Sequence, residues 1–458
     1  MEITVREAAA VCGGRVLGPG EETVLRHVTT DSRVSLGSDL FVPIIGERTD
    51  GHRFIDGAFA AGCAASLTSD PEAAPHSRPL ILVRDTEKAL QALGRHFRAA
   101  YKGPVVGVTG SVGKTTTREM IKLALSAGGP VTGTEKNFNS PIGLPITLCH
   151  MDSSASAAVL EMGISLPGEM DLLADLARPT AAVITNIGTS HIEFLGSREG
   201  ILEEKWKITS FLRPDQTAVL CADDDLLVAR LGQAPFATLG YGFSPAAAVR
   251  AENVREDAFA QTFDVILSGP CFPQERRFAC SLQVPGRHNV LNALAAVAAA
   301  ASLDIDPQEA AEKLAEYGGF SRRLQLRRAG GLTVIDDSYN ASVPSVKAAL
   351  DVLCRAPGRR IALLADMKEL GEMSAPLHRE VGRYAAALPI ELFLTLGDAI
   401  RDTEAELAAA GRTVLRAQDR EDAVRILREI AADGDTLLLK GSNSMKLNEI
   451  ADALCTPM

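Results

Sequence analysis

The residues best suited to chemistry lie in one segment, residues 109–116, which reads TGSVGKTT. The segment follows the apolar run VVGV and precedes a helical pattern, the setting of a phosphate-binding loop. Glycines let backbone N–H groups approach phosphate oxygens, a lysine reaches the β- and γ-phosphates, and a Thr hydroxyl can bind Mg²⁺. Because Val108 stands where the pattern GxxxxGK[ST] expects glycine, the match is to the shorter form GxxGK[ST]. The alternative is a Gly-rich turn with an incidental lysine. The predicted nucleotide-binding residues of this loop are Gly110, Ser111, Val112, Gly113, Lys114, Thr115 and Thr116.

Two further side chains could hold a magnesium ion beside these phosphates. Glu161 ends the apolar strand AAVLE, and carboxylate oxygens are ligands that Mg²⁺ prefers. His191 follows the apolar run AAVITNI in the loop GTSHIE. Each has an ordinary alternative: Glu161 as a polar residue at a strand end, and His191 as a solvent-exposed or locally hydrogen-bonded histidine.

Residue type alone does not decide the role of two other features, Lys205 and the segment 134–143. Lys205, in EEKWKI, has the pattern of a solvated helix lysine beside two glutamates. The polar segment TEKNFNSPIG, residues 134–143, could bind a polar ligand through its amides or could simply connect two elements.

The elements that would position these residues alternate between strand and helix from residue 104 to about 221. Apolar runs at 105–109, 157–162 and 181–187 each precede a helical pattern. This alternation predicts a parallel sheet covered by helices on both faces, with ligands beyond the carboxyl ends of its strands. Residues 247–284 alternate polar and apolar side chains and predict an antiparallel annex.

The flanking zones complete an α/β protein of about three domains, as a length of 458 residues suggests. The first zone holds short strand-like pieces, followed by an amphipathic helix at 86–100 with Leu90, Leu93 and Phe97 on one face. The last zone alternates strands and helices again and predicts a second open α/β sheet. The predicted domains are residues 1–84, 85–322 and 323–458.

Composition narrows the class of protein. The formal net charge of −11 argues against sequence-independent nucleic-acid binding, which depends on Lys and Arg. The 8 cysteines include no CxxC pair, so buried free thiols are expected rather than a zinc site or a disulfide framework. The N-terminus has no continuous apolar signal segment, and the longest apolar stretch, 293–303, is too short to span a bilayer. These features predict a cytoplasmic protein without membrane insertion.

Five separated segments resemble the Mur ligase family, the ATP-dependent amino-acid and peptide ligases of cytoplasmic peptidoglycan synthesis. They are GVTGSVGKTTTREMI (107–121), TEKNFNSPIGLP (134–145), VIDDSYNAS (334–342), LADMKELGEMSAPLHREVG (364–382) and LLLKGSNSMK (437–446). The chain is most similar to members that join D-alanyl-D-alanine to UDP-N-acetylmuramoyl-tripeptide through an acyl phosphate. The resemblance implies ATP and Mg²⁺ as cofactors and a monomer. It also implies a small N-terminal domain for the UDP-muramyl substrate, a central P-loop ATPase domain and a C-terminal Rossmann-like ligase domain.

The resemblance also implies roles for individual residues. Lys205 matches a lysine that CO₂ carbamylates, which turns a cation into a carboxylate-like group facing the metals. With Lys114 and His191 it forms the implied catalytic set, while Thr115, Glu161 and His191 match magnesium ligands. The remaining matches are His288, Asn289 and Asn292 for the adenine side of ATP; Arg323, Asp337, Tyr339 and Asn340 for the nucleotide on domain closure; Ser32 and Arg33, with the segment ERTDGH (47–52), for the UDP group; and Asn137 and Asn139 for the muramyl-peptide channel.

Two other functions stay open on the sequence. A folate polyglutamate ligase shares the style of phosphate loop, although the UDP-site resemblance of residues 28–52 disfavours it. A nucleotide-dependent switch protein would bind ATP and release phosphate independently of any amine acceptor. The sequence leaves open whether the third residue of the tripeptide is diaminopimelate or lysine. Departures from the family pattern at Lys136, Ser140, Pro141 and Asn443 leave the peptide contacts open.

Overall fold

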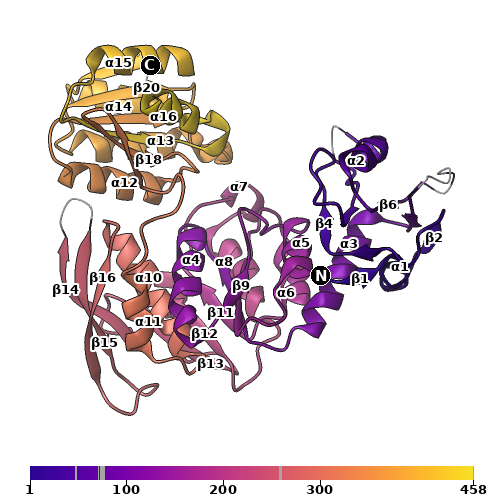
Figure 1. Ribbon diagram of the computed structural model, residues 1–458. Coiled ribbons are helices and arrows are strands. Elements are labelled where there is room, and N and C mark those ends of the chain that lie inside the picture. Colours follow the sequence, from indigo (N-terminus) through magenta and orange to yellow (C-terminus); the bar gives the residue numbers. More distant parts are fainter. Residues whose placement is uncertain (47–48, 71, 73–77, 257–259, 457–458) are drawn as a thin grey trace.

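The chain forms three lobes in the computed structural model, which describes residues 1–46, 49–70, 72, 78–256 and 260–456 (Figure 1). The N-terminal lobe runs from β1 to α3, the central lobe from β8 to α11, and the C-terminal lobe from β17 to α16. In Figure 1 the C-terminal lobe lies above the central lobe, and the N-terminal lobe lies to the right of the central lobe.

The N-terminal lobe is built on a sheet of strand order β2-β7-β6-β5-β4, parallel except for the antiparallel pair β2 and β7. Its elements are β1 (Ile3–Thr4), α1 (Val5–Cys12), β2 (Arg15–Leu17), β3 (Val24–Leu25), β4 (His27–Thr29), β5 (Asp39–Phe41), η1 (Gly51–Phe54), α2 (Ile55–Ala61), β6 (Ala65–Thr68), β7 (Leu80–Leu82) and α3 (Thr86–Ala100).

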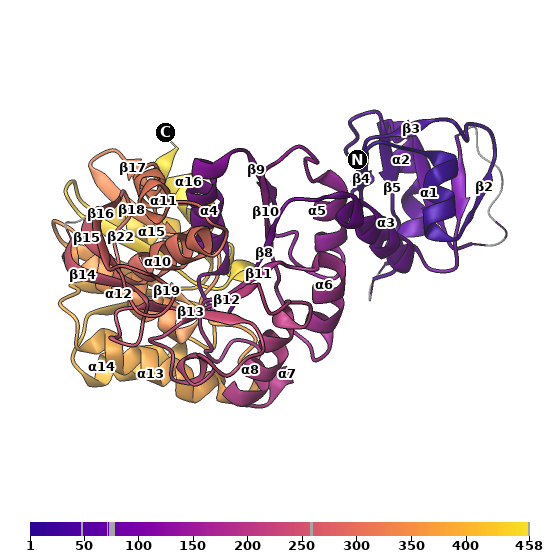
Figure 2. The same ribbon diagram turned by 90° about the horizontal axis from the view of Figure 1, so that it is seen from below.

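Helix α3 has the bounds that the sequence predicts. Asp85 caps it by accepting the backbone N–H groups of Glu87 and Lys88. Leu90 and Leu93 are fully buried, in the same apolar cluster as strands of the N-terminal sheet. On another side α3 packs against α5 (Gly143–His150) of the central lobe, where Figure 2 shows the two lobes joined. A Cβ added to Gly94 would lie 2.9 Å from the Cα of Pro145, so the two helices can approach closely only with glycine there.

The central lobe contains the predicted strand–helix alternation. The strands expected at 105–109, 157–162 and 181–187 are observed as β8 (Val105–Thr109), β10 (Ala157–Glu161) and β11 (Ala181–Ile184). β8 lies between β11 and β10, parallel to both and fully buried. The other elements are α4 (Lys114–Leu125), η2 (Ser126–Gly128), β9 (Val131–Gly133), α6 (Glu169–Ala177), α7 (Ile192–Leu195), α8 (Arg198–Trp206), η3 (Lys207–Thr209), β12 (Thr217–Cys221), α9 (Asp225–Val228), β13 (Ala237–Gly242), β14 (Val249–Glu256), β15 (Gln261–Leu267), β16 (Arg276–Leu282), α10 (Arg287–Ala301) and α11 (Pro307–Leu314).

The antiparallel segment expected at 247–284 is present, but as an extension of the central sheet rather than an annex. β14, β15 and β16 pair antiparallel with one another. β14 also pairs parallel with β13, through Tyr241 opposite Val249 and Gly242 opposite Arg250. The sheet order is therefore β16-β15-β14-β13-β12-β11-β8-β10-β9. Alternating side chains indicate the pairing mode of a strand but not the edge on which it docks.

The C-terminal lobe has the second open sheet, in the order β17-β18-β22-β19-β20-β21, with only β17 antiparallel to its neighbour among the described strands. Apolar clusters cover both of its faces. Its elements are β17 (Gln325–Ala329), β18 (Leu332–Asp337), α12 (Val343–Arg355), β19 (Arg360–Ala365), η4 (Gly371–Met373), α13 (Ser374–Ala386), β20 (Leu392–Leu396), α14 (Arg401–Ala409), β21 (Val414–Ala417), α15 (Arg420–Ile430), β22 (Thr436–Lys440), η5 (Asn443–Met445) and α16 (Leu447–Cys455).

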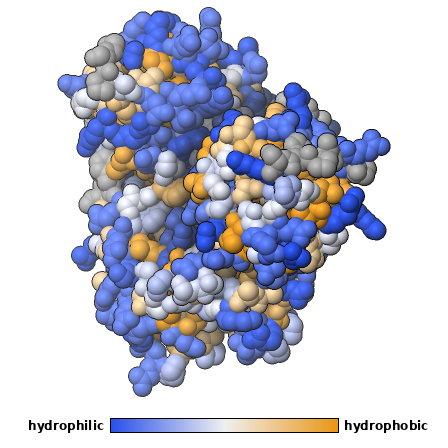
Figure 3. Space-filling view, turned by 45° about the vertical axis from the view of Figure 1, so that its right-hand side comes forward, coloured by the Kyte–Doolittle hydropathy of each residue, from blue (hydrophilic) through white to orange (hydrophobic). Residues whose placement is uncertain are grey.

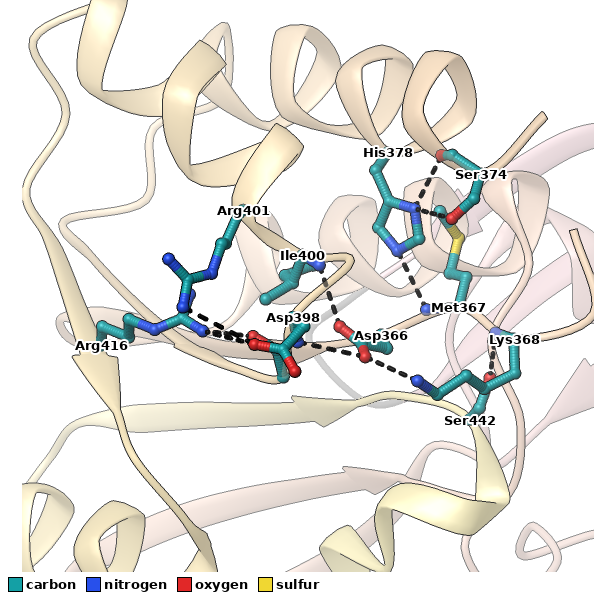
Figure 4. Close-up of polar contacts among 11 residues, drawn as sticks. Asp366, Met367, Lys368, Ser374, His378, Asp398, Ile400, Arg401, Arg416 and Ser442 are labelled. Atoms are coloured by element: carbon teal, nitrogen blue, oxygen red, sulfur yellow. Dashed lines mark hydrogen bonds and ion pairs between the residues drawn. The ribbon is translucent and has the colours of Figure 1, made fainter. Parts of the chain in front are cut away.

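A buried carboxylate ties together the loops that follow three of these strands (Figure 4). Asp366, directly after β19, accepts the N–H groups of Ile400 (2.9 Å) and Asp398 (3.3 Å) beyond β20. The Lys368 ammonium also bonds to Asp366 (2.7 Å), while the Lys368 N–H donates to Ser442 Oγ beyond β22 (2.9 Å). The loops at the carboxyl edge of this sheet therefore hold one another in place.

We expect Asp366→Ala to lower the free energy of unfolding of the C-terminal lobe by about 2–3 kcal/mol, because buried donors lose their acceptor. The matched control is Asp398→Ala, since the Asp398 side chain is 93% exposed and its ion pairs with Arg401 and Arg416 are 3.6 Å long. We expect that control to change stability by less than about 0.5 kcal/mol. Hydrogen-exchange protection of β19 and β20 measures both effects. Equal losses in the two variants would contradict the structural role of Asp366.

Large apolar side chains are exposed on the surface of the N-terminal lobe, which composition did not indicate. In the N-terminal lobe, Val34, Leu36 and Ile45 are each more than half exposed, and Figure 3 shows apolar side chains gathered on this forward lobe. No helix within the described ranges is long and apolar enough to cross a membrane.

The prediction of buried thiols is confirmed for Cys63, Cys149, Cys221 and Cys280. It is wrong for Cys271, which is exposed because it lies in the turn between β15 and β16.

Candidate active site

One large cavity, with a volume of about 630 Å³, opens between the central and C-terminal lobes. Residues at or just beyond the carboxyl ends of β8, β10, β11 and β18 border it, as expected for open α/β sheets. Most of the predicted site residues line it: Ser111, Val112, Gly113, Lys114, Thr115, Thr116, Asn139, Glu161, His191, His288, Asn289, Asn292, Arg323, Asp337, Tyr339 and Asn340.

The phosphate loop leads into the N-terminus of α4. The first helical hydrogen bond runs from the Thr117 N–H to the Gly113 carbonyl (2.8 Å). The N–H groups of residues 114–116 therefore have no acceptor within the helix and are available to an anion. Gly110 has a φ of +150°, and a Cβ there would lie 1.9 Å from Thr185 Oγ1, so the loop requires glycine at this position.

Asn186, which sequence reasoning missed, holds the loop from the neighbouring strand end. Its Oδ1 accepts the Val112 N–H (2.9 Å), its Nδ2 donates to the Val112 carbonyl (2.9 Å), and its carbonyl accepts the Ser111 N–H (3.0 Å). These two loop N–H groups are used to fix the loop, whereas those at the start of α4 are available to an anion. The signal in the sequence is an asparagine two residues beyond the strand next to β8.

Lys114 points along the loop. Its Nζ donates to the Gly110 carbonyl at 2.8 Å. Burial lowers the pKa of Lys114; the carboxylate of Glu161 opposes this shift, and the nearby charge of Arg323 adds to it. A desolvated cation at the start of a helix provides strong stabilisation for phosphate oxygens.

Glu161 is buried rather than an ordinary polar residue at a strand end. It is 2% exposed, and three donors surround its carboxylate. Oε2 accepts from Thr115 Oγ1 (2.9 Å) and Arg118 Nη1 (3.0 Å), and Oε1 accepts from Asn139 Nδ2 (2.7 Å). Arg323 reaches across from the C-terminal side, where its Nη2 donates to Thr115 Oγ1 (2.9 Å).

His191 lies at the start of α7 with a φ of +63°, a left-handed conformation that is uncommon for histidine. Its Nδ1 lies 3.2 Å from Glu369 Oε2 of the C-terminal lobe, yet this buried nitrogen has no well-aligned hydrogen-bond partner among the described residues. The His191 side chain is 20% exposed, and this contact reaches the C-terminal lobe rather than its own loop.

The donor set fits a magnesium ion shared with a nucleotide. The Thr115 hydroxyl and the Glu161 carboxylate are hard oxygen ligands, and the imidazole of His191 offers a third donor atom. Within the described residues, no three His, Cys, Asp or Glu side chains form a cluster that could hold a metal alone. Phosphate oxygens would have to complete such a site.

Lys205 is 1% exposed, so the interpretation as a solvated helix lysine is wrong. Burial holds the pKa of Lys205 well below its usual value, and the charge of Lys114 lowers it further. The adjacent Glu204 makes other contacts, since it accepts the N–H groups of Gly168 (2.9 Å) and Met170 (3.0 Å). Helix α8 therefore carries a buried amine close to the phosphate loop.

Helix α10 holds the cavity residues expected on the adenine side of ATP. On α10, Asn292 Oδ1 accepts from Thr117 Oγ1 (3.0 Å), and Asn292 Nδ2 donates to Asn289 Oδ1 (3.2 Å). Burial lowers the pKa of His288 to about 4.

The C-terminal lobe contributes Asp337, paired at 2.8 Å with Lys440, a lining residue that sequence reasoning missed. Asn340 is held through its carbonyl, which accepts from the Lys440 ammonium (2.6 Å). The guanidinium of Arg323 lies over the Tyr339 ring at 4.2 Å from the centroid.

The structure does not bring every predicted residue to the cavity. Ser32 and Arg33 lie between β4 and β5 of the N-terminal lobe, where Arg33 is 85% exposed and bonds to Asp31 (2.8 Å). Asn137 is exposed, whereas its neighbour Asn139 reaches Glu161. Lys205 and Gly110 are not among the residues that line the cavity. In the expected UDP segment 47–52, residues 47 and 48 lie outside the described residues.

Comparison with known proteins covers nearly the whole chain. The catalytic domain of the Mur ligase family matches residues 24–98, the Mur ligase middle domain 108–300, and the glutamate ligase domain 322–443. The UDP-N-acetylmuramoyl-tripeptide–D-alanyl-D-alanine ligase of Bacillus subtilis is 38% identical over 462 residues, with 98% of each chain covered. The chain belongs to the Mur ligase family.

Solved Mur ligase structures share the fold. MurF from Acinetobacter baumannii matches with a TM-score of 0.88 at 27% identity, over 99% of both chains. The MurF ligase of Thermotoga maritima, solved in complex with ADP, matches with a TM-score of 0.79 at 27% identity, over 94% of this chain and 97% of that one. The predicted fold class is confirmed: an α/β protein with the N-terminal, middle and C-terminal domains of a Mur ligase.

Proposed function

We propose that this chain is an ATP-dependent ligase that joins D-alanyl-D-alanine to UDP-N-acetylmuramoyl-tripeptide in cytoplasmic peptidoglycan precursor synthesis. The observation that carries the proposal is full-length similarity to ligases of that name, with a phosphate loop opening into the cavity. The ADP complex of the Thermotoga maritima relative supports ATP as the nucleotide.

The reaction begins with activation of a carboxylate, because a carboxylate anion is a poor electrophile. The terminal carboxylate of the tripeptide attacks the γ-phosphate of ATP, which yields an acyl phosphate and ADP. The ammonium of D-alanyl-D-alanine first loses a proton. The neutral amine then attacks the acyl carbon, the bond from this carbon to the phosphate oxygen breaks, and the second amine proton leaves with the phosphate as hydrogen phosphate, which leaves the amide. Lys114 and the N-terminus of α4 stabilise the negative charge on the transferred group.

Magnesium would be held by Thr115, Glu161 and His191. When bound there, the ion neutralises charge on the phosphate oxygens. Glu161 is already oriented for this role by its three donors. We also propose that Lys205 carries a carbamate, since a buried amine of lowered pKa beside Lys114 is suited to react with CO₂.

The substrates are assigned to the three lobes. We propose a division into residues 1–84 for the UDP group, with Ser32 and Arg33 as contacts, 85–322 for ATP, and 323–458 as the ligase domain. Asn137 and Asn139 would line the peptide channel, and Asn139 is suited to this because it also bonds to Glu161. Closure of the C-terminal lobe would exclude water from the acyl phosphate. We expect a monomer.

Omission of one substrate at a time tests the function. We expect phosphate release to require ATP, UDP-N-acetylmuramoyl-tripeptide and D-alanyl-D-alanine together, and to fall at least about 10²-fold when any one is left out, because each provides a reacting group. Tripeptides with diaminopimelate or lysine at position three, measured side by side, identify the preferred donor. A muramyl tripeptide without UDP serves as the control for the N-terminal lobe.

Other outcomes point to the alternatives. Phosphate release that is independent of any amine acceptor would indicate a nucleotide switch. Activity with a folate and glutamate in place of the two peptides would indicate a folate polyglutamate ligase. Equal activity on the tripeptide without UDP would contradict the role of the N-terminal lobe.

A further inference from the structure

Arg118 is the largest fully buried side chain in the described part of the chain, at 1% exposure. It lies on α4, one turn after Lys114. Burying a guanidinium is costly unless its donors are paired, so its partners indicate why an arginine occupies this position.

One nitrogen of Arg118 joins two parts of the active site. Nη1 donates to Glu161 Oε2 (3.0 Å) and to the backbone carbonyl of Lys136 (3.0 Å). Nε donates to Glu119 (2.8 Å), which fixes the guanidinium from the same helix. The arginine therefore bridges the carboxylate on the metal side and the loop of residues 134–142.

The carbonyl that Arg118 holds belongs to a strained residue. Lys136 has a φ of +50°, a left-handed conformation that costs a non-glycine residue about 1 kcal/mol or more. Three residues later, Asn139 donates to the other oxygen of Glu161 (2.7 Å). The loop thus contacts Glu161 twice, directly through Asn139 and indirectly through Arg118.

We propose that Arg118 is a positioning residue that couples the nucleotide–metal site at Glu161 to the donor-peptide loop 134–142. A shift of the loop that moves the Lys136 carbonyl must move the guanidinium, and with it the Glu161 carboxylate. Binding of the muramyl peptide and binding of the metal–nucleotide then favour each other, and the two effects are equal by linkage. The inference rests on the proposed function, since it takes the loop as the peptide channel.

Lysine cannot replace this geometry, although it keeps the charge. A guanidinium presents donors in a fixed fork that can serve two elements and Glu119 together, whereas an ammonium on a flexible stem is a single point of contact. Arg118→Lys should therefore uncouple the two sites without leaving Glu161 beside an uncharged side chain.

The test measures binding of Mn²⁺–ADP by calorimetry, with and without saturating UDP-N-acetylmuramoyl-tripeptide. In the wild type we expect the tripeptide to strengthen Mn²⁺–ADP binding about 5-fold or more, within the usual range of coupling. We call the affinity for Mn²⁺–ADP with tripeptide, divided by the affinity without it, the coupling ratio. In Arg118→Lys we expect this ratio to fall below about 2-fold. The matched control is Arg98→Lys, because Arg98 also bridges backbone carbonyls, those of Tyr101 and Arg178, but lies outside the cavity.

A second variant leaves the buried Arg118 unchanged. Glu119→Gln weakens the contact of the guanidinium with Glu119, whose side chain is 22% exposed. It should lower the coupling ratio by a smaller amount than Arg118→Lys does. A ratio in Arg118→Lys equal to that of the wild type and Arg98→Lys would overturn the proposal, and so would a wild-type ratio of one. If the wild type fails to bind the tripeptide at all, the proposed function fails with it, a result distinct from binding without coupling.

Discussion

Lys114→Ala should lower phosphate release by about 10²- to 10³-fold or more while leaving a folded protein. The expected loss follows from removing the one side chain of the phosphate loop that brings a full positive charge to the transferred group. The fold should survive, because Lys114 Nζ bonds to loop carbonyls, at 2.8 Å for Gly110, and not to the core. Phosphate release with all three substrates, together with thermal unfolding, measures the two halves of the prediction.

Lys122→Ala provides the matched control. Lys122 lies two turns further along α4 and is not among the residues that line the cavity. We expect its turnover to stay within about 2-fold of the wild type, as for a surface substitution away from the site. Near-normal phosphate release by a soluble Lys114→Ala protein would overturn the assignment of the phosphate loop.

The central sheet could be predicted because its signals are local. Each strand–helix unit has its own change of hydrophobic period, and β8, β10 and β11 appear where the apolar runs stand. Helix α1, by contrast, was missed in an Ala-rich stretch, although the capping box of Thr4 and Glu7 marks its start. The capping residues thus indicate the start of a helix that hydrophobic periodicity alone does not reveal.

The contacts within the site could not be predicted, because they join elements that are distant in sequence. Arg118 and Glu161 are 43 residues apart, and Arg323 and Thr115 are 208 apart. Nothing in the spacing of EEKWKI distinguishes a buried Lys205 from an exposed one, since the burial depends on how α8 packs in the folded chain. The resemblance to a family supplied residue identities, and the structure supplied the bonds between them.

Lys205 should be carbamylated in the active enzyme. CO₂ adds to a neutral amine and releases a proton, and burial together with the charge of Lys114 lowers the pKa of Lys205 and so favours the neutral form. With ¹³C-bicarbonate we expect a carbamate signal in the wild type that is lost in Lys205→Met. Activity should fall when CO₂ is stripped at mildly acidic pH and should recover with bicarbonate.

Lys207→Met is the matched control for that experiment. Lys207 lies two residues away and is about one-third exposed. The hydrogen bonds that its ammonium donates to Asp171 and Glu204 raise its pKa, so it stays protonated and unreactive toward CO₂. The carbamate signal should persist in this variant. A signal that is unchanged in Lys205→Met, or absent from active wild-type protein, would rule out the modification.

The same buried amine gives a prediction for stability in protein stripped of CO₂. Because the pKa of Lys205 is lower in the folded state than its ordinary value near 10.4, the unfolded chain binds more protons at pH values between the two. The free energy of unfolding should therefore increase with pH across that window, by up to about 1.4 kcal/mol per pH unit. Denaturant unfolding of the stripped wild type and of Lys205→Met, compared over a pH series, isolates this contribution. The variant should be the more stable protein at neutral pH, with the difference shrinking as pH rises; parallel pH profiles would mean that Lys205 is not a desolvated amine.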